Sequence, residues 1–78
     1  MGNYLFKKHE KNIELISNFL REIRFSENLT NENVQELTGL NKNTISRVEN
    51  NYNLTLVTLL ELADAYGVKP SVILSIID

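Results

Sequence analysis

The segment LTGLNKNTISRVENN, residues 37–51, constrains the fold most, because a glycine between two leucines precedes a run of polar and basic residues. We expect Gly39 to end the first of these helices, because glycine takes a left-handed backbone at little cost. Beyond it, Ile45 and Val48 stand three residues apart, which is the spacing of one helix face. The segment therefore predicts two short helices joined by a tight turn, the second with a narrow apolar side.

Apolar residues recur at helical spacing in the rest of the chain, and no stretch indicates a strand. Start signals, including Ser/Thr/Asn caps and one proline, predict five helices. These helices are expected to start at or just after Phe6, Thr30, Asn41, Thr55 and Pro70. The inward residues expected in the second and fourth helices are Val34, Leu37, Leu56, Leu59, Leu62, Ala63 and Tyr66. The prediction is an all-α, compact five-helix domain over residues 1–78, with residues 1–12 as an N-terminal extension and 13–78 as the core.

Composition sets the protein class. The chain has 78 residues, of which 42 % are hydrophobic, and this suits one small globular domain. It has no cysteine, so disulfide and zinc-thiolate sites are excluded. No apolar run approaches the roughly 20 residues that span a bilayer, and the N-terminus lacks a secretory signal. We therefore expect a cytoplasmic protein without a membrane partner.

The third predicted helix has a distinctive outward face. If Ile45 and Val48 point inward, the opposite side carries hydrogen-bonding and cationic residues and no acid. These residues are Lys42, Asn43, Ser46, Arg47 and Asn50. Such side chains suit the base edges of the DNA major groove. Asn41 and Thr44, near the helix start, could bind phosphate with help from free backbone N–H groups. A plain solvated surface is the alternative interpretation.

Residues 29–51, LTNENVQELTGLNKNTISRVENN, resemble the helix-turn-helix of the lambda-repressor/Cro-type (Xre-like) family of DNA-binding proteins. The match is nearly letter for letter in TISRVE at residues 44–49. Residues 53–68, NLTLVTLLELADAYGV, resemble the leucine-rich segment that follows in that family. The resemblance covers about residues 20–74. It implies a lambda-repressor-like domain whose helix-turn-helix is formed by helices 2 and 3.

The resemblance also implies roles for individual residues. Lys42, Asn43 and Arg47 would read bases. The residues expected nearer phosphates are Asn31, Asn41, Thr44, Ser46 and Asn50. Arg24 and Glu49 match the internal ion pair of the family. Three departures stand out: Asn31 replaces the usual Gln, Leu54 replaces Pro, and Gln35 replaces a small Ala, so that Gln35 bends outward or the helix crossing is wider.

Several apolar residues exceed the needs of one core stripe per helix. They are Val57, Leu60, Val72, Ile76 and Ile77. Members of the resembled family often dimerise through this region, so we expect a homodimer interface here. The alternative is that Ile76 and Ile77 only cover the core at the chain end. In the extension, Tyr4, Leu5 and Phe6 could lengthen the first helix and pack on the fourth or fifth helix, or Lys7, Lys8 and Lys11 could contact phosphate.

The predicted function is a sequence-specific DNA-binding transcriptional regulator of repressor or controller type. Its expected partners are double-stranded DNA and a second copy of the chain, with a second regulatory protein as a further candidate. The alternative is a protein-interaction module of the same fold, such as an antitoxin-like partner, which the formal net charge of −2 favours. His9 has no catalytic neighbours in the pattern, and no metal-ligand spacing occurs. We expect neither enzymatic activity nor a cofactor.

Overall fold

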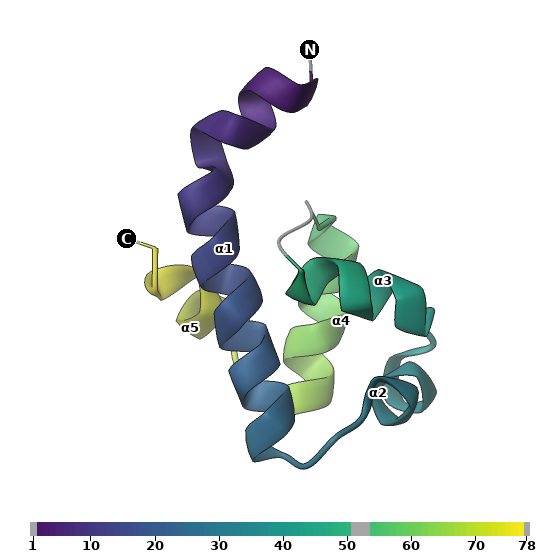
Figure 1. The fold of residues 1–78 in the computed structure, drawn as a ribbon. Coiled ribbons are helices and arrows are strands. Elements are labelled where there is room, and N and C mark those ends of the chain that lie inside the picture. The colour runs from purple at the N-terminus through teal and green to yellow at the C-terminus, as the bar shows by residue number, and fades with distance from the viewer. Residues whose placement is uncertain (1, 51–53, 78) are drawn as a thin grey trace.

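The computed structural model describes residues 2–50 and 54–77, with side chains from Leu5 onward. This part of the chain forms five helices and no strand, which confirms the predicted all-α class (Figure 1). The helices are α1 (Gly2–Ser26), α2 (Asn31–Thr38), α3 (Lys42–Glu49), α4 (Leu56–Tyr66) and α5 (Pro70–Ser75). None of the described helices is long and apolar enough to cross a membrane.

The short helices begin and end where their capping residues stand. At α2, Asn33 N donates to Thr30 Oγ1 at 3.0 Å, and Thr30 N donates to Asn33 Oδ1 at 2.9 Å. This reciprocal pair is a capping box with Asn in the place of the usual Glu or Gln. The side chain of Thr55 caps α4 in the same manner, accepting from Thr58 N at 3.2 Å. These local signals explain why the predicted starts of α2 and α4 were correct.

Every helix contributes to one core. The buried apolar residues are Ile16, Leu20, Val34, Ile45, Val48, Leu59, Leu62, Ala63, Tyr66 and Ile73. Ile45 and Val48 are both buried, as their spacing predicted. The long helix α1 contacts α3, α4 and α5, so it joins α3 of the helix-turn pair to the two C-terminal helices. The core therefore fixes α3 from behind and leaves its other side open.

The prediction that Leu37 and Leu56 lie in the core is wrong. Leu37 is 60 % exposed, because Thr38 takes the inward position four residues after Val34 and its hydroxyl donates to the Val34 carbonyl at 2.7 Å. Leu56 is 68 % exposed, because it is the first residue of α4 and Thr58 is the buried residue of that turn. Helical spacing identifies a face, but it does not show where the neighbouring helices stop.

Helix α1 is longer than the sequence pattern indicated. It has 25 residues, and its N-terminal turns project beyond the other helices (Figure 1). The extension does lengthen the first helix, but Leu5 is exposed rather than packed. Its three lysines are also exposed, as is His9.

Candidate nucleic-acid interface

The helix pair α2–α3 is joined by a short turn built around Gly39. Gly39 has φ +81° and its N–H donates to the Gln35 carbonyl at 2.8 Å, which ends α2. Leu40 N then donates to Thr38 Oγ1 at 3.0 Å and keeps the turn tight. The two helices cross in Figure 1 and share the core through Val34 and Ile45. This is the geometry of a helix-turn-helix.

The outward side of α3 carries the residues that the sequence pattern singled out. Lys42, Asn43 and Arg47 are exposed, as are Asn41 before the helix and Asn50 after it. Thr44 and Ser46 are partly exposed, and so is Asn31 at the start of α2. Helix α3 itself places no acid on this side, because Glu49 is its only acid and is 5 % exposed; Glu32 of α2 lies 3.5 Å from Lys42 Nζ at its edge. The surface is thus polar and cationic.

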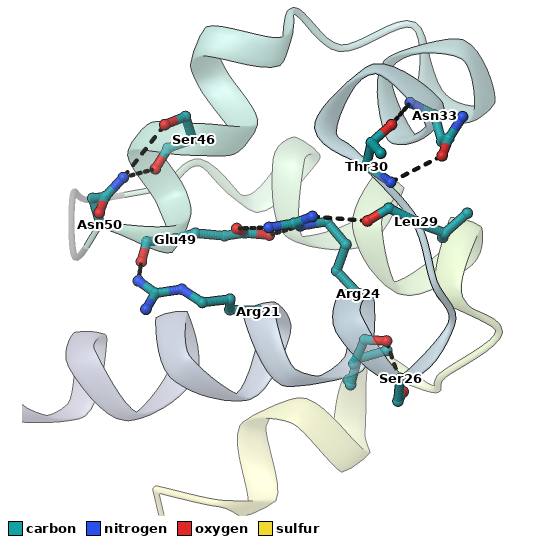
Figure 2. A network of polar contacts seen from close by, with 10 residues as sticks. Arg21, Arg24, Ser26, Leu29, Thr30, Asn33, Ser46, Glu49 and Asn50 are labelled. Atoms are coloured by element: carbon teal, nitrogen blue, oxygen red, sulfur yellow. Dashed lines mark hydrogen bonds and ion pairs between the residues drawn. The ribbon is translucent and has the colours of Figure 1, made fainter.

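Glu49 is buried because α1 holds it with two arginines (Figure 2). Arg24 Nε and Nη2 donate to the two Glu49 carboxylate oxygens at 2.7 and 2.9 Å. Arg24 Nη1 also donates to the Leu29 carbonyl at 2.7 Å, and Arg21 donates to the backbone carbonyl of Glu49. The hydrogen bonds to Glu49 raise the pKa of Arg24 above its usual value, against the opposing effect of burial. The arrangement ties the end of α3 to α1.

Tyr66 lies close enough to this ion pair for both charges to act on its hydroxyl. Burial raises the pKa of Tyr66 to about 12, and the negative charge of Glu49 adds to the rise. The buried hydroxyl oxygens of Tyr66 and Ser17 have no hydrogen-bond partner in the described part of the chain. Burial and the charge of Glu49 therefore both favour the neutral form of Tyr66.

The first turn of α3 is capped from two sides. Asn43 N donates to Asn41 Oδ1 at 2.7 Å, and Lys42 N donates to Gln35 Oε1 at 2.7 Å. Thr44 N donates to the Asn41 carbonyl at 2.9 Å. The expectation that free backbone N–H groups here would assist phosphate binding is therefore wrong, because these three are already paired. Gln35 is exposed, and its side-chain oxygen faces the first residue of α3.

Two residues of the polar surface also have partners within the chain. Asn50 Nδ2 donates to the Ser46 carbonyl at 2.7 Å and lies 3.3 Å from Ser46 Oγ (Figure 2). Lys42 Nζ lies 3.5 Å from Glu32 Oε2. The pKa of Glu32 is lowered first by a hydrogen bond from its own backbone N–H and next by the charge of Lys42. The sequence reasoning missed Arg21, Gln35 and Glu32 as partners of α3. Arg21 could have been noticed, because it stands one helical turn before Arg24 on the same side of α1.

The residues expected at a dimer interface divide into two groups. Val57, Leu60 and Val72 are exposed, at 67 %, 44 % and 45 % of their surface. Ile76 and Ile77 are partly buried and pack against the core. Leu56 and Leu74 add further exposed apolar surface on α4 and α5, and neither was expected there. The exposed group is the part of this region that remains free for a partner.

Comparison with known proteins identifies the fold and the family. A helix-turn-helix family model matches residues 20–73, more than half of the chain. Among solved structures, the restriction-modification controller protein C.AhdI from Aeromonas hydrophila matches with a TM-score of 0.74 and 30 % sequence identity. The match covers 81 % of this chain and 97 % of C.AhdI. No curated protein sequence matches significantly. The chain therefore belongs to the lambda-repressor/Cro-type (Xre-like) helix-turn-helix family of DNA-binding regulators.

Proposed function

We propose that the protein is a sequence-specific transcriptional regulator of repressor or controller type that reads the major groove with α3. The observation that carries the proposal is that Glu49 is buried and lies away from the polar surface of α3. The only acid of that helix is buried against Arg24, while Lys42 and Arg47 stay exposed. A surface that served only solvation would have no need to exclude acids, whereas a surface that approaches phosphate does.

The side chains have complementary roles in this proposal. Lys42, Asn43 and Arg47 read base edges, because Lys and Arg pair with guanine and Asn pairs with adenine. The side chains of Asn31, Asn41, Thr44, Ser46 and Asn50 contribute phosphate contacts. Because Asn41 and Asn50 already bond within the chain, they offer DNA only their remaining donor or acceptor atoms. Arg21 and Arg24 do not touch DNA in this account, but they set the position of α3.

The DNA-binding form is proposed to be a homodimer. Val57 and Leu60 on α4 and Val72 on α5 are exposed apolar residues on helices that do not take part in the helix-turn-helix. A two-fold dimer through these residues would present two copies of α3 to one DNA face, at half-sites about 34 Å apart. The similarity to the controller protein C.AhdI supports the controller type, because the match covers 97 % of the length of C.AhdI.

A mobility-shift titration tests the proposal. The probes are a duplex from upstream of the gene and a scrambled duplex, each at about 50 and 200 mM salt. The specific duplex should bind more tightly than the scrambled one, and both affinities should fall with salt. Arg47→Ala should weaken specific binding by about 1–3 kcal/mol and relax the base preference.

Lys69→Ala is the matched control, because it removes an exposed cation that lies before α5 and away from α3. Its effect on specific binding should be small. Equal losses from the two substitutions would contradict the assignment of Arg47. Salt-independent binding, or none at all, would instead support the alternative of a protein-interaction module, which the net charge of −2 favours.

A further inference from the structure

Helix α2 holds the first residue of α3 at two points. Gln35 Oε1 accepts from the backbone N–H of Lys42 at 2.7 Å, and Glu32 Oε2 lies 3.5 Å from Lys42 Nζ. Glu32 and Gln35 are three residues apart on α2 and therefore project from one side of it. Both contacts cross the turn, so they form only when α2 and α3 are packed together.

The two contacts act on different parts of Lys42. The bond from Gln35 fixes the backbone at the start of α3, which keeps the lysine side chain within reach of Glu32. The Lys42 and Glu32 side chains remain 54 % and 65 % exposed, so the pair is open to solvent and to an incoming ligand. Lys42 and Arg47 are the two cations of α3, and the charge of Lys42 is offset by Glu32 before any ligand arrives.

We propose that Glu32 is an affinity-limiting residue that competes with DNA for Lys42. This inference rests on the proposed function and adds an internal regulator to it. The groups on DNA that bind a lysine ammonium are phosphate oxygens and the N7 and O6 atoms of guanine. Either kind of acceptor must displace the Glu32 carboxylate to gain the full charge of Lys42. Glu32 thus lowers affinity for all DNA if Lys42 meets phosphate, or for the specific site alone if Lys42 meets a base.

Glu32→Gln tests the competition, with Glu36→Gln as the matched control. Glu36 is also exposed on α2 and forms no ion pair within the described residues, so its substitution removes the same charge without releasing Lys42. DNA affinity is measured on specific and scrambled duplexes at about 50 and 200 mM salt. At the lower salt, Glu32→Gln should tighten binding about two- to fivefold more than Glu36→Gln, the range of an exposed ion pair. The salt dependence should also become steeper, because one more cation is free to displace counterions.

Lys42→Met provides the decisive background. If Glu32 acts through Lys42, the excess gain of Glu32→Gln over Glu36→Gln should vanish when Lys42 is replaced. An excess that survives in the Lys42→Met background, or equal gains from the two glutamate substitutions, would overturn the proposal. Tightening on both duplexes assigns Lys42 to phosphate, and tightening on the specific duplex alone assigns it to a base.

The outcome also separates this proposal from the proposed function. If the wild-type protein binds neither duplex, the DNA-binding proposal fails and the role of Glu32 fails with it. If the wild type binds specifically but the two glutamate variants behave alike, only the competition is refuted. Thermal melting of all variants checks that folding is retained, which is expected because Glu32, Glu36 and Lys42 are exposed.

Discussion

Replacing buried Glu49 with Ala should destabilise the fold more than the same change at an exposed acid, because it leaves Arg24 without its main partner. The Arg24 side chain is 12 % exposed and would retain only the Leu29 carbonyl among its present acceptors. Removing one member of a buried ion pair costs about 3–5 kcal/mol. Because one acceptor remains, we expect the lower end, about 3 kcal/mol. That is a large share of the total stability, roughly 4–12 kcal/mol for a domain of this size.

Urea denaturation and thermal melting measure this effect. The midpoint of melting should fall by roughly 12–24 °C for a loss of about 3 kcal/mol in such a small domain. Glu36→Ala is the control, since an exposed acid without an ion pair among the described residues should change stability by less than about 0.5 kcal/mol. The double variant Arg24→Met, Glu49→Leu should recover much of the loss, because no buried charge is then left unpaired. A loss below about 1 kcal/mol for Glu49→Ala would refute the reasoning.

Three further predictions concern single residues. The folded-state pKa of Tyr66 is raised to about 12. The contribution of neutral Tyr66 to the free energy of unfolding is therefore fully present below pH 10 and is lost as the pH rises from 10 to 12. The variant Tyr66→Phe removes a buried unpaired hydroxyl, so urea titrations should show that its stability matches or exceeds that of the wild type at pH 7. Above pH 10 the variant should lose less stability than the wild type. An equal loss of stability above pH 10 would contradict this. Gly39→Ala should cost about 1 kcal/mol by thermal melting, purely from the φ of +81°, because nothing lies within 4 Å of the added methyl group; no loss at all would show that the turn relaxes. Leu60→Glu should shift sedimentation toward the monomer while Leu37→Glu, an equally simple change on α2, should not; a dimer that survives Leu60→Glu would place the interface elsewhere.

Local signals made most of the fold predictable from sequence. Thr30, Asn41 and Thr55 cap helices because their short side chains accept backbone N–H groups, and this requires no knowledge of distant residues. Ile45 and Val48 were predictable for the same reason, since their spacing alone defines a helix face. The extended first helix was only partly predicted, because residues 5–12 contribute no side chain to the core that would mark their conformation.

The polar partners of α3 could not be predicted in the same way. Gln35 reaches the Lys42 backbone across the turn, and Arg21 reaches a carbonyl 28 residues further along the chain. Both bonds depend on the packing of two helices, which helical spacing does not specify. The ion pair of Arg24 and Glu49 was expected only from the family resemblance, and the structure does place the two side chains in contact.

The central claim is that the outward side of α3 is the surface that meets DNA. The most direct measurement is an amide NMR titration of the protein with the duplex that binds most tightly in the mobility-shift experiment. The account predicts that the largest shift changes fall in residues 41–50, with smaller changes at the start of α2 and little change in α5. Changes centred on α4 and α5, with α3 unaffected by the duplex, would contradict the account.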